Sequence, residues 1–441
     1  MPHGTAAIVS QGDEIVLGQT LDTNSKWLSD RLMELGILPV EHVSLPDDEA
    51  AIAGTFQRLA DRVDLVICSG GLGPTADDLT RSALARALGE ELIEDQVSLE
   101  QIRAWFIARG RSMPELNRVQ ALRPTSSRSI PNQHGTAPGI AARFVRGGRA
   151  CDVFCLPGPP RELFPMFERH VAPMVEPPRG VTVRTLVLHT IGLGESDVAT
   201  LLRASAAGDL MARDRNPLVG TTASGGVVSV RLRYRGPLAP ADADEELRRV
   251  AGLAKDLIGP YVFAEGGTAH EALPTAVVNA MREAGRSLAV VESCTAGLLG
   301  SMIGDVAGAS DVFLGGLITY ADHVKHNAAR VPAHLLTRHG AVSAEVAAAM
   351  AQGGLGATSA TDCLSITGIA GPGGGSVQKP VGTVWIAHAK QTAAGATTAV
   401  RRFSMAGDRR SVREWSARSA LAMLWLDLRG SPERPLLREV R

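Results

Sequence analysis

Aromatic side chains are scarce in this 441-residue chain, at 4% of the sequence. Neither sign of charge is in excess, because 45 basic and 46 acidic residues give a formal net charge of −1. A surface that coats nucleic acid or an anionic membrane carries a basic excess, and a base-stacking platform needs aromatic rings. The composition therefore gives no support to direct binding of nucleic acid or of a membrane surface.

Cysteine is also sparse, with five residues that form no CxxC pair and show no spacing typical of a zinc site. This pattern argues against a disulfide framework and against a structural zinc site, and a reducing cytoplasm fits best. The first 14 residues lack the charged region and long apolar run of a secretion signal. We therefore expect a cytoplasmic protein.

Long hydrophobic runs are missing too. The most apolar stretch, 297–321, contains Asp305 and Asp311, and each aspartate costs about 3 kcal/mol near the centre of a bilayer. This stretch predicts a buried helix, loop and strand, and no membrane segment. Lysine is rare as well, at five positions in the chain, so that a lysine within a candidate site is notable.

Hydrophobic residues make up 45% of the chain, enough for a normal core, and at about 150 residues per domain the length suggests roughly three domains. Apolar strands alternate with loops and helices at both ends of the chain. This alternation predicts an α/β class: two three-layer α/β domains, 1–174 and 266–441, joined by a small α+β module, 175–265. The strands are expected at 6–10, 37–43, 64–68, 139–145, 151–156, 181–188, 218–222, 227–234, 287–291, 312–320, 363–367, 382–389 and 398–403. Ligands of such sheets bind beyond the carboxyl ends of the strands.

The first candidate site is the turn Gly70-Gly-Leu-Gly-Pro-Thr75, between a buried strand and a helix. Glycines there let phosphate oxygens approach backbone N–H groups. Asp77 and Asp78 open the helix and would repel a bare pyrophosphate, so we expect a divalent cation such as Mg²⁺ between them. Asp13 and Glu14 would add a second pair of carboxylates. In the alternative interpretation, the aspartates only cap a helix and Gly12-Asp13 only makes a turn.

The second candidate is Glu292-Ser-Cys-Thr-Ala-Gly297, which follows a predicted strand. It holds three hydroxyl or thiol groups, but no histidine stands at a telling spacing and the GxSxG elbow is absent from the sequence. A serine can instead be activated by a desolvated lysine, and Lys325 follows the strand that ends near Tyr320. In the alternative, Ser293 and Thr295 cap the next helix and Lys325 is solvated.

The third candidate is Thr367-Gly-Ile-Ala-Gly-Pro-Gly-Gly-Gly375, where a predicted strand ends in small, flexible residues. Such a stretch exposes backbone N–H groups to an anion. Arginine forks would complete a phosphate site, although a run of charge is more often a solvated helix face. The arginines in question are Arg401, Arg402, Arg409, Arg410 and Arg413.

Taken together, these motifs resemble the CinA family (competence/damage-inducible protein A) over almost the whole chain. The N-terminal block is similar to the family's molybdopterin-binding-like domain through the stretches 12–24, 70–80, 132–139 and 156–162. The C-terminal block is similar to its nicotinamide-mononucleotide deamidase domain through 292–295, 306–310, 319–320, 340–343, 367–375 and 379–383.

The resemblance implies two activities in pyridine-nucleotide salvage. The C-terminal domain would hydrolyse nicotinamide mononucleotide to nicotinate mononucleotide and ammonia without a cofactor. Its implied catalytic residues are Ser293 as nucleophile and Lys325 as base, with Tyr320 and Ser310, and its implied substrate-binding residues are Thr295, Thr367, Gly368, Gly371, Gly373 and Arg409. The N-terminal domain would cleave ADP-ribose with a divalent metal on Asp13 and Asp78, and with Gly70, Gly71, Gly73 and Thr75 around the substrate. A homodimer is also implied.

Two departures from the family pattern stand out. Tyr320-Ala-Asp-His-Val-Lys325 replaces a frequent Tyr-Ser-Asn-Glu-Ala-Lys, and Ala296 replaces a frequent glycine, which restricts the turn. Two other functions remain as alternatives: a molybdopterin-handling protein, which would not need the Glu292-Ser-Cys-Thr loop, and a non-catalytic partner in DNA uptake or recombination.

Overall fold

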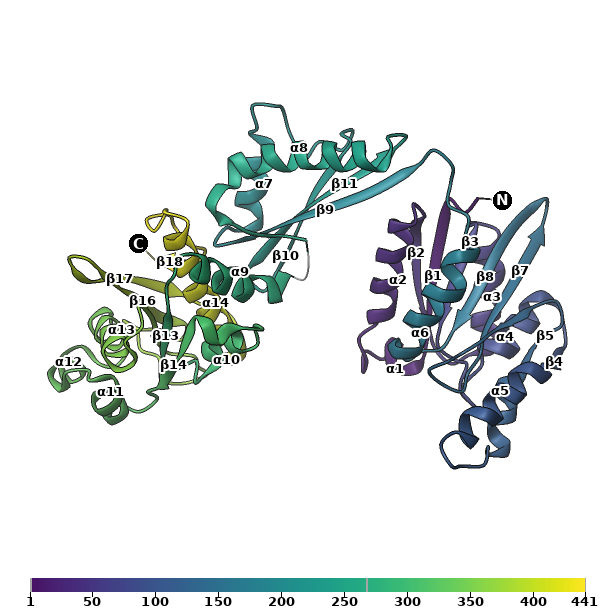
Figure 1. The fold of residues 1–441 in the computed structure, drawn as a ribbon, viewed down its shortest axis with the longest axis horizontal. Coiled ribbons are helices and arrows are strands. Elements are labelled where there is room, and N and C mark those ends of the chain that lie inside the picture. Colours follow the sequence, from purple (N-terminus) through teal and green to yellow (C-terminus); the bar gives the residue numbers. More distant parts are fainter. Residues whose placement is uncertain (1, 267–268, 441) are drawn as a thin grey trace. The chain divides into compact units, whose positions relative to one another are not determined.

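The computed structural model describes residues 2–266 and 269–440. Its chain divides into two compact units, one of Met1–Arg184 with Tyr234–Asp244 and one of Thr185–Arg233 with Glu245–Arg441 (Figure 1). The expected mixed α/β class is confirmed. The predicted boundary at 266 adjoins residues 267 and 268, which lie outside the described residues.

The first unit is built around a six-stranded sheet in the order β2-β1-β3-β8-β7-β6. The four strands β2, β1, β3 and β8 are parallel, whereas β7 runs antiparallel to both of its neighbours, β8 and β6. Continuous apolar runs form β1 and β3 because both faces of the sheet are covered. The strands are β1 (Thr5–Gln11), β2 (Leu38–Leu45), β3 (Leu65–Ser69), β6 (Arg128–Ile130), β7 (Gly139–Arg146) and β8 (Arg149–Leu156).

Helices cover the two faces of this sheet. Leu28 of α2 and Leu163 of α6 pack in the core of one face, and Phe56 of α3 and Leu84 of α4 pack in that of the other. The sheet and its two helical layers are the three layers expected. The helices are α1 (Asp13–Val16), α2 (Thr23–Glu34), α3 (Glu49–Ala60), α4 (Thr80–Leu88), α5 (Gln96–Ile107) and α6 (Pro160–Met166), beside a hairpin of β4 (Leu92–Glu94) and β5 (Leu122–Pro124).

The middle of the chain forms a separate four-stranded sheet in the order β10-β11-β9-β12, with two helices. The first four residues of β11 are all buried, and buried residues alternate with more exposed ones from Val230 to Tyr234, so one face of this sheet packs on a core. Its elements are β9 (Thr182–Ile191), α7 (Glu195–Arg203), β10 (Leu218–Ser224), β11 (Val227–Gly236), α8 (Pro240–Ile258) and β12 (Val262–Glu265).

The C-terminal block has a second six-stranded sheet in the order β14-β13-β15-β16-β17-β18. β13 is parallel to both β14 and β15, and the remaining pairs are antiparallel. Leu299 of α10 and Leu421 of α14 lie in the core of one face, and Met350 of α13 lies in that of the other. The strands are β13 (Leu288–Glu292), β14 (Phe313–Ile318), β15 (Asp362–Gly368), β16 (Thr383–Thr392), β17 (Gly395–Ser404) and β18 (Glu439–Val440).

The helices of this block are α9 (Ala269–Glu283), α10 (Leu298–Gly304), α11 (Asp322–Ala329), α12 (Ala333–His339), α13 (Ala344–Thr358) and α14 (Arg409–Leu428). The middle sheet and the C-terminal block share apolar packing, since Val227, Tyr261 and Phe263 belong to the same core as α9 and α14. A Cβ on Gly226 would lie 2.6 Å from the Trp415 ring. The middle sheet is therefore seated closely on α14.

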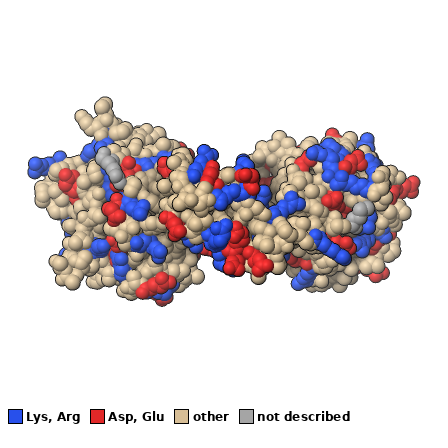
Figure 2. Space-filling model, turned by 90° about the horizontal axis from the view of Figure 1, so that it is seen from above, with Lys and Arg blue, Asp and Glu red and all other residues tan. Residues whose placement is uncertain are grey.

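Charge of the two signs is interspersed on the face shown in Figure 2, in line with the balanced composition. None of the helices in the described ranges is both long and apolar enough to cross a membrane.

Candidate functional sites

A cavity of about 560 Å³ lies at the carboxyl edge of the first sheet, where β1, β3 and β8 end. Its lining includes the predicted glycines Gly70, Gly71 and Gly73, but neither Thr75 nor Asp13. No lysine, arginine or histidine of the described chain lines it, whereas six carboxylates do: Glu14, Asp22, Asp47, Asp77, Asp78 and Glu162. An anionic ligand in this cavity therefore needs a cation as counter-charge.

The glycines of the 70–75 turn are required by close contacts. Gly70 has φ +103 and Gly71 has φ +66, and a Cβ on Gly70 would lie 2.5 Å from the Gln11 carbonyl oxygen. Beneath the turn, the buried Arg81 donates to the carbonyl oxygens of Leu72 and Gly73. Burial lowers the pKa of Arg81 to about 10, so its guanidinium is still charged at neutral pH.

Asp78 is bound to the turn itself. Its carboxylate accepts from the Gly73 N–H at 2.6 Å, and from the Thr75 N–H at 2.8 Å and hydroxyl at 2.6 Å. Two N–H groups that a phosphate would need are thus occupied. Asp13 lies beside the cavity, where its carboxylate accepts from the Asp47 N–H at 3.2 Å. Of the two predicted metal ligands, Asp78 lines the cavity and Asp13 does not, and a shared metal ion on this pair stays a prediction.

Two carboxylates that sequence reasoning left without a role are better placed. Asp47 lines the cavity, and its carboxylate accepts from the Gln11 amide at 2.9 Å and from the Asp13 N–H at 3.2 Å. Glu162 is 8% exposed and accepts from the Asn132 amide at 2.8 Å. The signals were present, since Asp47 follows a strand of the parallel sheet and Glu162 belongs to the 156–162 motif.

The second candidate site is the turn after β13. Glu292 is 1% exposed, and its carboxylate accepts from the N–H groups at the start of α10, namely those of Gly297, Leu299 and Gly300. Ala296 has φ +50, a left-handed conformation that is uncommon for a residue with a side chain. The predicted restriction of this turn is thus seen as a strained residue directly after Thr295.

Ser293 and Lys325 are both buried, at 8% and 1% exposed. The Lys325 ammonium donates to the Tyr320 carbonyl oxygen at 3.0 Å and lies 3.4 Å from the Asp322 carboxylate. No hydrogen bond joins it to Ser293 in the described chain. Catalytic hydrogen bonds are often long before substrate binds, so the two residues remain a candidate pair. The expectation of a solvated Lys325 is wrong.

Cys294, next to Ser293, is 5% exposed. Burial raises the pKa of its thiol to about 11, an effect that Glu292 reinforces and Arg409 and Arg413 oppose. The thiol is therefore protonated at neutral pH and is a poor nucleophile, because the thiolate is the reactive form.

The third candidate stretch meets the start of α14. Arg409 donates to the Gly371 carbonyl oxygen at 2.7 Å and to the Tyr320 hydroxyl at 2.6 Å. A cavity of about 540 Å³ is lined here by Gly371, Arg409, Arg410 and Arg413 among others. Arg401 instead pairs with Glu439 at 2.9 Å, away from this cavity. Of the five arginines considered, those at the start of α14 are therefore the ones placed to bind an anion.

Other predicted residues of this block have structural contacts. The fully buried Thr367 donates to the Ala341 carbonyl oxygen at 2.8 Å. A Cβ on Gly368 would lie 2.7 Å from Val384, so this glycine permits close strand packing. Gly373 has open space around it. Thr295 is fully buried and its hydroxyl has no hydrogen-bond partner.

Ser310 does not lie with the other predicted catalytic residues. It precedes β14, whose Phe313 pairs with Leu288 at the beginning of β13, whereas Ser293 follows the end of β13. The two serines are at opposite edges of the sheet, separated by roughly 20 Å of strand at about 3.3 Å per residue. The assignment of Ser310 to the site is corrected on this ground.

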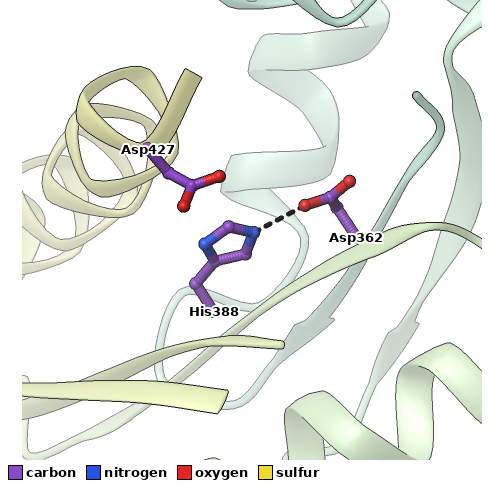
Figure 3. A group of neighbouring side chains, drawn as sticks. All are labelled: Asp362, His388 and Asp427. Atoms are coloured by element: carbon purple, nitrogen blue, oxygen red, sulfur yellow. Dashed lines mark hydrogen bonds and ion pairs between the residues drawn. The ribbon is translucent and has the colours of Figure 1, made fainter. Parts of the chain in front are cut away.

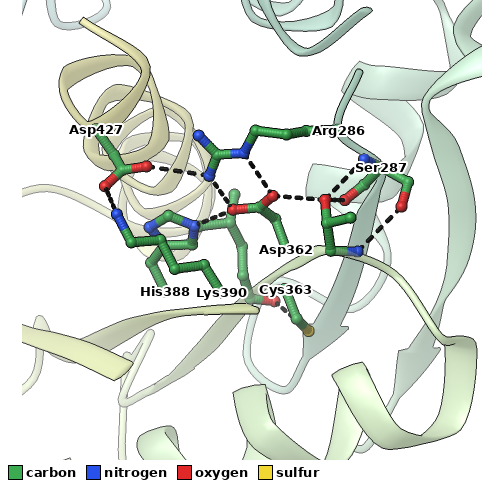
Figure 4. Close-up of polar contacts among 9 residues, drawn as sticks. Arg286, Ser287, Asp362, Cys363, His388, Lys390 and Asp427 are labelled. Carbon is green, nitrogen blue, oxygen red and sulfur yellow. Dashed lines mark hydrogen bonds and ion pairs between the residues drawn. The ribbon is translucent and has the colours of Figure 1, made fainter. Parts of the chain in front are cut away.

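A buried cluster of charge lies at the edge of this sheet opposite Ser293. His388 lies between Asp362 and Asp427 (Figure 3), and its Nε2 is 2.7 Å from an Asp362 oxygen. These three are the one group of the described chain with metal-ligand spacing. Arg286 contacts both aspartates, however, and Lys390 donates to Asp427 at 2.5 Å (Figure 4). Because two cations already neutralise the two carboxylates, the group is an ion-pair cluster and a poor metal site.

Family models match three consecutive parts of the chain. "Probable molybdopterin binding domain" matches residues 7–177, "Damage-inducible protein CinA KH domain" matches 185–264, and "CinA C-terminal domain" matches 270–428. A competence-damage inducible protein of Symbiobacterium thermophilum is 41% identical over 427 residues, 95% of this chain and 97% of that protein. A CinA-like protein of Geobacter sulfurreducens is 39% identical over 425 residues, 95% of this chain and 98% of that protein.

Among solved structures, a competence/damage inducible protein of Agrobacterium tumefaciens is 34% identical and covers 37% of this chain and 96% of that one, with a TM-score of 0.35. The two relatives named above carry the assignment, because each is matched over nearly its whole length. The chain belongs to the CinA family.

Proposed function

We propose that the C-terminal block hydrolyses the carboxamide of nicotinamide mononucleotide to nicotinate mononucleotide and ammonia. The observation that carries this proposal is the convergence of Ser293, Lys325 and Arg409 on the loops around the carboxyl edge of β13, β14 and β15. Arg409 and the glycine-rich stretch suit a phosphate, and Ser293 and the buried Lys325 suit acyl transfer.

In the proposed reaction, Ser293 Oγ attacks the carboxamide carbon while Lys325, in its amine form, takes the hydroxyl proton. The carbon–nitrogen bond then breaks, and the departing nitrogen takes that proton and leaves as ammonia. Water then hydrolyses the acyl-serine ester, which releases nicotinate mononucleotide and regenerates Ser293. Tyr320, held by Arg409, lines the approach to the serine.

We also propose that the N-terminal block cleaves the pyrophosphate of ADP-ribose with a divalent cation. Carboxylates line its cavity, and no lysine, arginine or histidine of the described residues does. Such a set of oxygen ligands favours a hard cation. Asp47, Asp77 and Glu162 are better placed to hold it than Asp13. A bound cation would offset the phosphate charge and polarise a phosphoryl oxygen.

The residues of the cavity would supply the remaining contacts. The turn at Gly70 and Gly71 lets phosphate oxygens reach the backbone, and Arg81 adds a buried positive charge beneath it. A second candidate for this block is pterin binding, favoured by the name of the family model that matches residues 7–177.

One experiment tests both proposals. The purified chain is incubated with nicotinamide mononucleotide and with ADP-ribose, with and without a chelator, and ammonia and AMP are measured. Ammonia release that survives the chelator and AMP release that does not are the expected results. Absence of ammonia from the untreated chain contradicts the deamidase proposal, and absence of AMP with every divalent metal tried contradicts the second.

A further inference from the structure

The turn after β13 leaves two of its amide N–H groups without an acceptor. In the described chain neither the Cys294 nor the Thr295 N–H donates a hydrogen bond to protein. The other amides from 293 to 300 have acceptors. Ser293 donates to the Ile366 carbonyl oxygen, Ala296 to that of Ser293 and Leu298 to that of Thr295, and the amides of Gly297, Leu299 and Gly300 donate to the Glu292 carboxylate. Buried amides are almost always paired, so two successive exceptions directly after Ser293 need an explanation.

Two side chains of the same segment are also unpaired. The Thr295 hydroxyl is buried and has no hydrogen-bond partner. The Ser293 hydroxyl makes no hydrogen bond to protein in the described chain, but its oxygen is not among the fully buried unpaired atoms, so solvent can reach it. An orphaned buried hydroxyl costs about 1–3 kcal/mol, and such groups are found where a ligand completes the hydrogen bonding. Four unpaired polar groups are thus confined to three consecutive residues.

One positive and one negative side chain, Arg413 and Glu292, hold this segment in place. Arg413 donates from Nε at 3.3 Å and from a terminal nitrogen at 2.7 Å to the Thr295 carbonyl oxygen. Glu292 is engaged with the amides that begin α10, so those amides are not available to a ligand. The anion-binding groups here are therefore the turn amides and not the end of the short helix.

We propose that the N–H groups of Cys294 and Thr295, together with the Thr295 hydroxyl, bind the carboxamide oxygen and stabilise the oxyanion formed on it. This inference rests on the proposed deamidation. When the Ser293 Oγ–carbon bond forms, the carbonyl electron pair moves to oxygen, and these donors meet the new negative charge. When the double bond re-forms, ammonia leaves with the proton that Lys325 removed from Ser293.

The position of the donors fits general acyl-transfer chemistry. The N–H of the residue after a serine nucleophile commonly contributes to an oxyanion hole, and donors fixed before the reaction stabilise charge without reorganisation. The buried segment also excludes water, which strengthens each hydrogen bond to the oxyanion.

The test compares Thr295→Val with Thr295→Ser in the full chain. Valine keeps the shape and removes the hydroxyl, whereas serine keeps the hydroxyl. We expect Thr295→Val to lower kcat for nicotinamide mononucleotide about 10- to 100-fold with KM nearly unchanged. Thr295→Ser should stay within about threefold of the original kcat, since the donor is retained. The Tm of Thr295→Val should be equal or higher, because an unpaired buried hydroxyl is gone.

A merely structural Thr295 gives the opposite pattern: kcat of Thr295→Val stays within twofold of the original, or falls only together with Tm. Either result overturns the role of the hydroxyl. A second measurement on the unaltered chain tests the backbone donors with thionicotinamide mononucleotide. Sulfur is a larger and weaker acceptor, so kcat/KM should fall at least about 100-fold against the amide, more than in alkaline hydrolysis without protein.

Equal enzymatic rates for the amide and the thioamide overturn the proposed donors. Failure of the underlying function looks different, because the unaltered chain then releases no ammonia from the amide at all. The two failures are therefore distinguished in a single assay series.

Discussion

Arg409 donates a hydrogen bond of 2.6 Å to the Tyr320 hydroxyl, which joins the first residue of α14 to the loop after β14. The same guanidinium donates to the Gly371 carbonyl oxygen at 2.7 Å. One arginine thus connects the start of α14 to two loops, one after β14 and one after β15, at the proposed deamidase site.

Removing this arginine should impair substrate binding. Arg409→Ala is expected to raise KM for nicotinamide mononucleotide by about 10- to 100-fold, the equivalent of roughly 1.5–3 kcal/mol for a lost charged hydrogen bond. The matched control is Arg429→Ala, because Arg429 is exposed at the opposite end of α14 and does not line this cavity. Equal effects of the two substitutions on KM would show that only net charge matters.

The choice of nucleophile is tested at Ser293 and Cys294. Ser293→Ala should abolish ammonia release and leave ADP-ribose cleavage intact. Cys294→Ala should retain substantial activity, because burial raises the pKa of the thiol to about 11 and so keeps it protonated. Ammonia release is measured for both variants. An active Ser293→Ala beside an inactive Cys294→Ala would identify a cysteine amidohydrolase.

The carboxylates of the N-terminal cavity are tested by neighbouring substitutions. Asp47→Asn removes a charge from the cavity and should lower ADP-ribose cleavage at least about tenfold and weaken divalent-metal binding. Asp48→Asn is the control, because Asp48 caps α3 through the Ala51 N–H and asparagine caps equally well. Metal binding is followed by calorimetry. Equal metal affinity in the two variants would remove Asp47 from the cation site.

The ion-pair cluster predicts how stability depends on pH. Burial alone would raise the pKa of Asp362, but hydrogen bonds from His388 and Arg286 outweigh it and lower the pKa to about 2. The stabilisation is therefore complete above the ordinary value of 3.8 and is lost as pH falls toward 2. Asp362→Asn should cost about 3–5 kcal/mol at pH 7, and less at pH 3.

This dependence is measured by chemical unfolding of the full chain at several pH values. Asp305→Asn, a change at an exposed position of the same block, serves as the control. A loss of stability in Asp362→Asn that is the same at pH 7 and pH 3 would contradict the ion-pair account.

The shared core makes a prediction about fragments. If the predicted domains were independent, a fragment of residues 266–441 alone would catalyse the proposed deamidation. Val227, Tyr261 and Phe263 of the middle sheet lie in the core that contains α9 and α14, however. A fragment of 185–441 should therefore show a Tm several degrees above that of 266–441. Thermal unfolding and ammonia release are compared for both fragments. Equal Tm values would mean that the shared packing contributes nothing.

The strands were largely predictable from sequence, whereas some helices were not. Apolar runs such as 64–68 predict a strand that is covered on both faces, and the observed β3 is Leu65–Ser69. The helix α13 carries Gly353, Gly354 and Gly356, which weaken helix propensity. Its glycines serve packing, because a Cβ on Gly353 would lie 1.8 Å from the Ala329 carbonyl oxygen. Such contacts between distant segments leave no local signal.

The candidate site shows the same division. The loops at 70–75, 292–297 and 367–375 were predictable because small residues that follow a strand leave the backbone open to a ligand, and this pattern is visible in the sequence. The placement of Ser310 was not, because a motif gives no information about the edge of the sheet that it reaches. Asp47 was overlooked because an aspartate before a helix is usually a cap, although its position after a strand of the parallel sheet was a signal for a ligand site.

The helix α14 carries Arg409 at its first turn and Asp427 at its last. At 1.5 Å per residue these residues are about 27 Å apart. Both ends of the helix are held, one by Gly371 in the loop after β15 and the other by Arg286 and Lys390. Polar contacts thus act as two anchors, one at each end of α14. Asp427→Asn would weaken the contacts that hold the C-terminal end of α14, and Arg409 at the other end would then be held less firmly. This substitution, remote from the substrate, should therefore weaken binding of the phosphate in the proposed site.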